Sequence, residues 1–347
     1  MASVPKTHKR LMVHKLTSNF REAVKTETAD VCKPKKGEVC IKNKYVGINA
    51  TDVNMTKGRY FVSGKVPFGV GLEGIGEVAE VGEGVEHLKV GQTVAYINGN
   101  SNSYAEYSCV PAMGTFPVPD TKPEYIALLV SGLTASISLD KCGRIVAGET
   151  VLITAAAGGT GHIAVQWAKA AECHVIGTCS TPEKEKLLKE LGCDRVINYK
   201  TENLDEVLTK EYKEGVNVVW ETIGGEVFQT CLKHLSIKGR MVVVGGISGY
   251  KTEDQQMKWN AELSTLPAQL LTKSTAVQGF LLTHYMDCFP TYYKYLSEHL
   301  QSGKLRIVID TGSKTADGEF LGMEGIIRGV EHLHSAKNSG KVIARIS

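Results

Sequence analysis

Residues 150–171 read TVLITAAAGGTGHIAVQWAKAA, and this segment decides the fold of the second half of the chain. It begins as an apolar, β-branched run typical of a buried strand, and it ends in an amphipathic pattern that predicts a helix. Between them, Gly158, Gly159 and Gly161 let the backbone approach a pyrophosphate, whose charge a helix N-terminus attracts. We interpret the segment as the phosphate-binding turn of a dinucleotide-binding domain. The alternative is a tight strand–helix turn without a ligand.

The surrounding sequence extends this pattern. From about Pro123 to Leu305, apolar strand-like runs alternate with helical ones, which is typical of a doubly wound parallel sheet of the Rossmann type in an α/β protein. We predict strands at 150–154, 174–178, 195–199, 217–221, 240–245 and 275–281, and helices at 161–171, 182–191, 226–234 and 286–301.

The N-terminal part has a different sequence pattern. Residues 7–119 consist of short β-branched runs separated by frequent glycine, which favours a β-rich domain with tight corners. After Lys304 we predict a strand at 305–309, a helix at 323–334 and a strand at 341–346. The predicted organisation is a β-rich domain of residues 1–126 completed by 305–347, and a dinucleotide-binding domain of residues 127–304.

Composition narrows the class of protein. The 347 residues are 42% hydrophobic and 22% charged, and the net charge of +3 is too small to indicate a nucleic-acid or membrane-surface partner. We find no apolar run approaching the roughly 20 residues of a membrane span, and no signal-peptide pattern or peroxisomal C-terminal tripeptide. The nine scattered cysteines form no C-x-x-C pair and favour reduced thiols. These features predict a cytoplasmic protein.

The end of the second predicted strand indicates which dinucleotide binds. NAD-dependent enzymes place a carboxylate there for the ribose 2′-OH, whereas this chain reads Gly-Thr-Cys-Ser-Thr at 177–181. Ser180 and Thr181 can donate to a 2′-phosphate, and the ammonium of Lys184 can neutralise its charge. The cofactor predicted is therefore NADPH. Alternatively, one of the two hydroxyls only caps the following helix.

Three strings carry a family resemblance: GINATD at 47–52, the glycine-rich stretch 69–76, and AAAGGTG at 155–161. They resemble the medium-chain dehydrogenase/reductase superfamily along essentially the whole chain. The resemblance implies that the β-rich domain is a GroES-like catalytic domain, with the active cleft between it and the Rossmann domain.

The chain departs from the zinc enzymes of this superfamily at both catalytic ligands. Asn49 stands where they carry cysteine, and Leu72 stands where they carry histidine. An amide is a poor zinc ligand and leucine is none, and the four-cysteine structural lobe is also missing, so we expect no metal. Without a Lewis acid, reduction of a C=C bond conjugated to a carbonyl is favoured, because hydrogen-bond donors can stabilise the resulting enolate.

The string VVGGISGY at 243–250 resembles the prostaglandin and leukotriene reductases more specifically. This resemblance implies NADPH-dependent reduction of α,β-unsaturated ketones, as in a 15-oxo-prostaglandin 13-reductase, with a small lipid-derived enone as substrate and a homodimer as the assembly. A quinone reductase or a general alkenal reductase is the first alternative. An NADPH-binding protein with a non-enzymatic role is the second.

The resemblance also implies site residues. Asn49 and Asp52 are assigned to the substrate pocket. The resemblance makes Tyr250 a cofactor contact, and its position after the fifth predicted strand, together with the need for a donor to the enolate, makes it the catalytic donor. The remaining cofactor-binding residues are Gly158, Gly159, Thr160, Gly161, Ser180, Lys184, Tyr199, Thr222, Val244, Phe280 and Asn338.

For four of these residues, an alternative role other than the one assigned stays open. Tyr199 is alternatively a half-buried edge aromatic, Phe280 a core residue and Asn338 a turn residue. Tyr250 follows the fifth predicted strand, at the carboxyl end of the sheet, where ligands bind in this fold. Its alternative role is to anchor its own loop or to stack on the cofactor.

Overall fold

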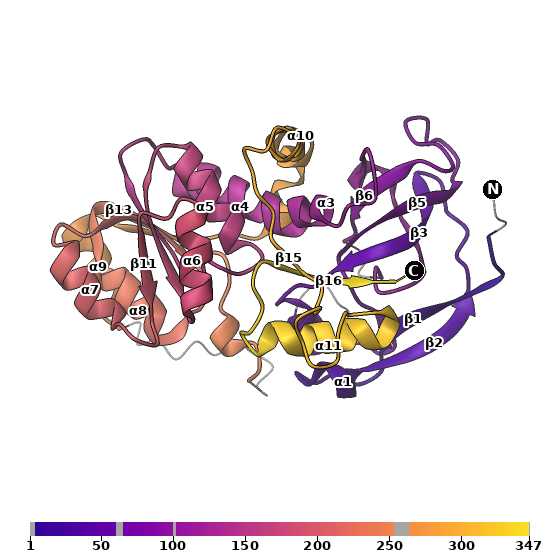
Figure 1. The fold of residues 1–347 in the computed structure, drawn as a ribbon, viewed down its shortest axis with the longest axis horizontal. Coiled ribbons are helices and arrows are strands. Elements are labelled where there is room, and N and C mark those ends of the chain that lie inside the picture. The colour runs from indigo at the N-terminus through magenta and orange to yellow at the C-terminus, as the bar shows by residue number, and fades with distance from the viewer. Residues whose placement is uncertain (1–3, 60–64, 100–101, 253–263, 347) are drawn as a thin grey trace. The chain divides into compact units, whose positions relative to one another are not determined.

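The computed structural model describes residues 4–59, 65–99, 102–252 and 264–346 (Figure 1). The chain divides into two compact units. The first comprises Met1–Val130, Lys251–Gln256 and Ile309–Ser347, and the second comprises Ser131–Tyr250 and Met257–Val308. Both ends of the chain therefore contribute to the first unit.

A six-stranded sheet forms the centre of the second unit, and all its neighbouring strands run parallel. Its order is β11-β10-β9-β12-β13-β14, so the strands count as 3-2-1-4-5-6 from β9, the order of dinucleotide-binding folds. The strands are β9 (Thr150–Ile153), β10 (His174–Cys179), β11 (Arg195–Asn198), β12 (Val216–Glu221), β13 (Leu235–Val243) and β14 (Ala276–Gly279). The predicted doubly wound parallel sheet is confirmed.

Helices alternate with these strands along the chain (Figure 1). They are α4 (Thr134–Ile137), η3 (Ser138–Gly143), α5 (Gly161–Ala170), α6 (Pro182–Glu190), α7 (Leu204–Glu211), α8 (Gly225–Lys233), η4 (Ile247–Gly249), α9 (Leu266–Lys273), η5 (Leu282–Cys288) and α10 (Phe289–Gln301). Apolar side chains between helices and sheet form the core, with Leu152, Ile176 and Val219 fully buried. The sequence prediction did not name α4, α7 or α9, and it began α10 three residues early, inside the 3₁₀ turn η5.

The predicted strand at 305–309 is wrong except for its last residue. Only β15 (Ile309–Asp310) is extended and paired. The backbone N–H groups of Arg306 and Val308 instead donate to side chains of α5, at 2.8 Å to Gln166 Oε1 and 3.2 Å to His162 Nε2. Because α5 side chains satisfy these donors, the segment needs no neighbouring strand.

The first unit is β-rich, as predicted. One sheet has the order β15-β16-β3-β5-β6-β8, with β7 pairing β3, and a smaller sheet has the order β2-β1-β4. These strands are β1 (Thr7–Val13), β2 (Val24–Asp30), β3 (Glu38–Gly47), β4 (Phe68–Gly69), β5 (Glu73–Val81), β6 (Thr93–Ile97), β7 (Tyr107–Pro111), β8 (Thr115–Pro117) and β16 (Lys341–Arg345). Gly76 on β5 is required by close packing, since a Cβ there would lie 2.0 Å from the carbonyl oxygen of Lys42 on β3.

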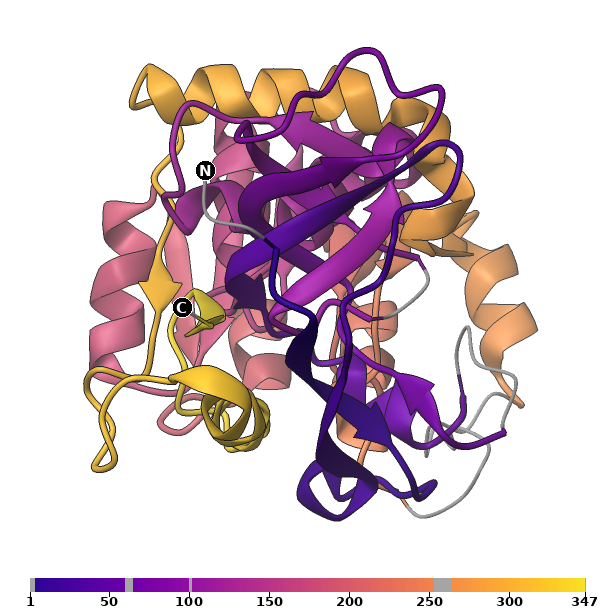
Figure 2. The ribbon, with the colours of Figure 1, turned by 90° about the vertical axis from the view of Figure 1, so that its right-hand side faces the viewer.

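Short helices complete this unit: α1 (Phe20–Ala23), α2 (Asp52–Thr56), η1 (Ala112–Gly114) and α3 (Glu124–Ala127). The long helix α11 (Gly322–His334), yellow in Figure 2, packs against β16, β1 and α1. Its buried residues, including Ile326 and Val330, join one apolar core with Leu11 and Val13 of β1. The C-terminal segment is therefore an integral part of the first unit.

One helical segment, Glu124–Gly143, is long and apolar enough by length and composition to cross a membrane. It comprises α3, η2 (Leu128–Leu133), α4 and η3. The prediction that no apolar run approaches such a length is corrected here, because Asp140 and Lys141 lie near the end of the run and do not interrupt it. In the structure, 83% of the most apolar 18-residue stretch of this segment is buried, as in a core helix.

The cysteines differ from expectation in one respect. Cys32 and Cys109 form a disulfide, so the prediction that all nine cysteines are reduced is wrong for this pair. The two residues are 77 positions apart in sequence, which hides the pairing. The fold brings them together because β7 carries Cys109 alongside β3, and Cys32 lies in the segment between β2 and β3. The other seven cysteines are free.

Candidate active site

The parallel sheet of the second unit gathers most of the predicted cofactor residues at one edge. Each follows the carboxyl end of a strand: residues 158–161 follow β9, Ser180 and Lys184 follow β10, Tyr199 follows β11, Thr222 follows β12, Val244 and Tyr250 follow β13, and Phe280 follows β14. Since neighbouring parallel strands end along the same edge of a sheet, these segments border one another. This edge is where ligands bind in doubly wound folds.

The turn after β9 leads directly into α5. The Ala155 N–H donates to Thr178 Oγ1 at 3.0 Å, which ties the turn to β10. A Cβ on Gly161 would lie 2.5 Å from the carbonyl oxygen of Ala155, so only glycine lets the helix start this close to the strand. Thr160 occupies the N-cap position of α5 and makes no side-chain capping bond there. This geometry fits the glycine pattern of a dinucleotide-binding turn.

The end of β10 has the donors that a 2′-phosphate requires. Thr181 is the N-cap of α6, and its side-chain oxygen accepts the Lys184 N–H at 3.3 Å, so the capping interpretation is confirmed for Thr181. Ser180 lies just before this cap and is half-buried. The Lys184 side chain rises from the first turn of α6 with the residue only 8% exposed. The Ser180 hydroxyl and the Lys184 ammonium suit an anionic group. The carboxylate of Glu183, in the same turn, is exposed to solvent.

Thr222 lies where the strand order reverses. Its N–H donates to Thr154 Oγ1 at 2.9 Å, and the two threonine hydroxyls are 3.1 Å apart. The preceding residue, Glu221, was missed by sequence reasoning. It is fully buried, its Oε1 accepts the N–H groups of Ile223 and Gly224, and burial raises the pKa of its carboxyl to about 7. A carboxyl ending an apolar strand is the signal that could have identified it.

Tyr250 lies on the loop after β13 and is 6% exposed. Its phenol oxygen accepts the Gly246 N–H at 3.2 Å, which is the loop-anchoring contact foreseen as the alternative role. Accepting this bond is compatible with donating another, because a phenol accepts through a lone pair and donates through its hydrogen. Val244 precedes this loop, half-buried, and its N–H donates to the carbonyl of Glu221 at 2.8 Å.

The two outer aromatic residues differ in burial. Phe280 is 7% exposed and stacks on Tyr285 with ring centroids 4.9 Å apart, so it is at least partly a core residue. Tyr199 is 48% exposed beside the end of β10, where its N–H donates to the carbonyl of Cys179 at 3.1 Å. The ammonium of Lys200 lies 5.6 Å from the Tyr199 ring centroid. Tyr199 is therefore a half-buried aromatic residue following the edge strand β11, in line with its alternative role.

In the first unit, a buried ammonium contacts Asn49, which stands where the zinc enzymes carry cysteine, and Glu73, which follows Leu72 in sequence. The Nζ of Lys341 is 2.5 Å from Glu73 Oε1 and donates to Asn49 Oδ1 at 2.7 Å. Asn49 Nδ2 in turn donates to Glu73 Oε1 at 2.9 Å, and Glu73 Oε2 accepts the Val130 N–H at 2.8 Å. The side chains of Lys341 and Glu73 are 2% and 0% exposed.

These partners fix the amide of Asn49, because an ammonium can only donate and a carboxylate can only accept. Asn49, 8% exposed, therefore presents its oxygen to the lysine and its amino group to the glutamate. Sequence reasoning missed Lys341 and Glu73. The available signal was a lysine opening the apolar strand KVIARI, because a lysine on a buried strand needs a partner.

Asp52 is fully buried next to this network. Its Oδ2 accepts the Asn49 N–H at 2.8 Å and the hydroxyl of Tyr104, and burial raises the pKa of the Asp52 carboxyl to about 7. The contacts of Asp52 thus position Asn49. Asn338 lies between α11 and β16, and its Nδ2 donates to the carbonyl of Gly340 at 3.2 Å, a contact within its own turn.

Two family models match the chain: the alcohol dehydrogenase GroES-like domain over residues 35–120 and the zinc-binding dehydrogenase model over residues 159–300. Prostaglandin reductase-3 of Bos taurus is 46% identical over 99% of this chain and 91% of its own length. A probable quinone oxidoreductase of Leishmania amazonensis is 39% identical over 99% of both chains.

A solved structure shows the same architecture. The quinone oxidoreductase of Escherichia coli complexed with NADPH superposes with a TM-score of 0.83 at 27% identity, covering 97% of this chain and 99% of its own. The predicted fold class, a Rossmann sheet plus a GroES-like domain, and the resemblance to the prostaglandin reductases are confirmed. The chain belongs to the medium-chain dehydrogenase/reductase superfamily.

Proposed function

We propose that this protein is an NADPH-dependent, zinc-independent oxidoreductase that reduces the C=C bond of α,β-unsaturated ketones. NADPH supplies the hydride when bound. The turn at 158–161 and α5 would hold its pyrophosphate, and Ser180 and Lys184 would hold its 2′-phosphate. Tyr199, Thr222, Val244, Tyr250, Phe280 and Asn338 are the further proposed contacts. The donor set after β10 supports NADPH, as do the relatives whose names record NADPH or NADP.

The observation that carries the reaction class is the Lys341 ammonium bound by Glu73 and Asn49. A cation already satisfies these oxygen atoms, and Leu72 offers no ligand atom, so these positions do not supply a catalytic zinc site. Hydride addition to an enone places charge on an enolate oxygen, and hydrogen-bond donors can stabilise that charge.

Tyr250 is the proposed donor to the enolate. Tyr250→Phe should lower the single-turnover rate of hydride transfer by about 10- to 1000-fold, with little change in NADPH affinity. Tyr295→Phe, at a half-exposed position on α10, is the matched control and should react at the wild-type rate. A Tyr250→Phe enzyme with the wild-type single-turnover rate would remove Tyr250 from the mechanism and leave it as a loop anchor.

The favoured substrates are 15-oxo-prostaglandins, supported by the similarity to prostaglandin reductase-3. Quinones are the second candidate, because quinone oxidoreductases recur among the relatives. Following NADPH absorbance with a 15-oxo-prostaglandin, a quinone and a short alkenal distinguishes them by kcat/KM. The proposal expects the highest value for the prostaglandin. Tight NADPH binding without turnover of any of the three would instead favour a non-enzymatic role.

Assembly and compartment complete the proposal. The domain boundaries proposed are residues 1–126 with 305–347, and residues 127–304. A homodimer joined through the Rossmann sheet edges is supported by β14, an edge strand whose side chains are largely exposed. Light scattering should give twice the chain mass, and cell fractionation tests the proposed cytoplasmic location.

A further inference from the structure

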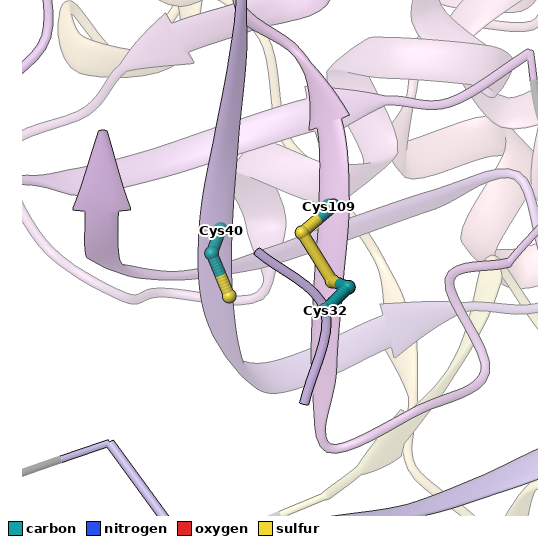
Figure 3. A group of neighbouring side chains, drawn as sticks. All are labelled: Cys32, Cys40 and Cys109. Atoms are coloured by element: carbon teal, nitrogen blue, oxygen red, sulfur yellow. A yellow bond between two sulfur atoms is a disulfide. The ribbon is translucent and has the colours of Figure 1, made fainter. Parts of the chain in front are cut away.

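Three cysteine side chains, none of them among the candidate site residues, converge in the first unit. The sulfur atoms of Cys32, Cys40 and Cys109 lie within 4.8 Å of one another (Figure 3). They come from three separate segments: the segment after β2, strand β3 and strand β7. Cys40 and Cys109 are directly opposite in the antiparallel pairing of β3 and β7, so their side chains leave the sheet on the same face.

We propose that the reduced form of this cluster binds one soft monovalent metal ion, Cu(I), through three thiolates. Sulfur ligands select soft ions. Within the described residues, the cluster contains no histidine or carboxylate ligand atom and no fourth cysteine. Structural zinc sites use four protein ligands in a tetrahedron, so three sulfurs alone suit a trigonal monovalent ion better than Zn²⁺.

The surroundings suit such a complex. Cys40 is completely buried, whereas Cys32 is half-buried, so an ion can enter beside Cys32. Three thiolates and one Cu(I) carry a net charge of −2. Lys33 and Lys35, both exposed, follow Cys32 in sequence and place positive charge on the same segment, whereas Lys36 is paired with Glu83 at 3.7 Å.

The disulfide between Cys32 and Cys109 makes binding dependent on redox state. A dithiol reductant opens it by thiol–disulfide exchange: the reductant becomes a disulfide, and two protein thiols form. The three thiols then lose their protons as the ion binds.

The test is a competition between the full-length protein and the Cu(I) chelator bathocuproine disulfonate under anaerobic conditions. Protein pretreated with a dithiol and then desalted should take up one Cu(I) per chain, and oxidised protein should take up none. Cys32→Ser, Cys40→Ala and Cys109→Ser should each lower the affinity about 100-fold or more, because even outer-shell changes cost about 10- to 100-fold. Cys288→Ser, outside the cluster, should leave the affinity unchanged.

X-ray absorption of the copper-loaded wild-type protein supplies a measurement that does not depend on the variants folding. Three sulfur neighbours at one distance support the site, and two overturn it. Equal uptake by oxidised and reduced protein, insensitivity to Cys40→Ala, or preferential binding of Zn²⁺ offered at the same concentration would also overturn it.

Discussion

Replacing Lys341 with methionine tests whether the buried ammonium holds the first unit together. Methionine keeps the length and apolar stem of the side chain but removes the charge. The substitution deletes the 2.5 Å contact with Glu73 and the 2.7 Å bond to Asn49. It leaves the Glu73 carboxylate buried, with only the Val130 N–H and the Asn49 amide as donors.

The expected cost follows from that burial. Both partners are almost completely excluded from water, and removing one member of such a pair costs about 3–5 kcal/mol because the other charge stays buried and uncompensated. The double variant Lys341→Met/Glu73→Gln should lose less than the single variant, since no charge remains. The coupling free energy should be about 1–3 kcal/mol. Lys337→Met, exposed and four residues earlier, should change stability by less than about 0.5 kcal/mol.

Hydrogen–deuterium exchange can locate this effect within the chain. Peptides covering β16 and β3 should exchange faster in Lys341→Met, whereas peptides covering β9 and β12 in the other unit should not change. Trp167 and Trp220 lie in the described part of the second unit, so urea unfolding followed by tryptophan fluorescence serves as an internal control. If Lys341→Met were as stable as Lys337→Met in β16 and β3, the ammonium would not be a structural centre of this unit.

The parallel sheet could be predicted from the sequence because its signals are local. Residues 150–171 carry a strand, a glycine turn and a helix in succession, and each later apolar run repeats the same alternation. The strand expected at 305–309 failed for a non-local reason. Its backbone donors bond to Gln166 and His162, which lie about 140 residues earlier in the chain. Periodicity contains no information about such partners.

The candidate site likewise contains residues that could be predicted from local sequence and residues that could not. The residues after each strand of the second unit could be placed because a strand's carboxyl end is readable from sequence. Lys341 was not predicted, because its partners, Asn49 and Glu73, lie nearly the whole chain away and meet it only once β16 pairs with β3. The Cys32–Cys109 disulfide is hidden for the same reason, since only the pairing of β3 with β7 brings Cys109 to that face. A sequence motif identifies residues within one short segment, whereas a buried charge pair between distant segments can be identified only from the tertiary fold.

Three further predictions concern the cofactor, the metal and pH. Lys184→Ala should weaken NADPH binding by about 1.5–3 kcal/mol and NADH binding far less. Titration with each cofactor measures this, and Lys186→Ala, at an exposed position, is the control. Equal losses for the two cofactors would mean that Lys184 does not contact the 2′-phosphate. Because Asn49 and Leu72 replace two zinc ligands, purified protein should contain far less than one zinc per chain by mass spectrometry and should keep its activity in the presence of chelators. Stoichiometric zinc whose removal by a chelator abolishes activity would refute the proposed reaction class. The third prediction concerns Glu221, whose folded pKa of about 7 lies above the value of 4.5 that we take for the unfolded chain. The folded protein therefore binds this proton more tightly, so the stabilisation is fully present below pH 4.5 and is lost as pH rises through about 7. The loss approaches about 3 kcal/mol above pH 8, from the difference between the two pKa values. Asp52 titrates in the same range, so only a difference between variants isolates Glu221. Glu221→Gln should gain stability relative to wild type between pH 5 and pH 8 in urea denaturation, whereas the exposed Glu214→Gln should follow the wild-type curve. A constant difference between Glu221→Gln and wild type across this range would show that the carboxyl is already ionised at pH 5, and that its two backbone donors outweigh its burial.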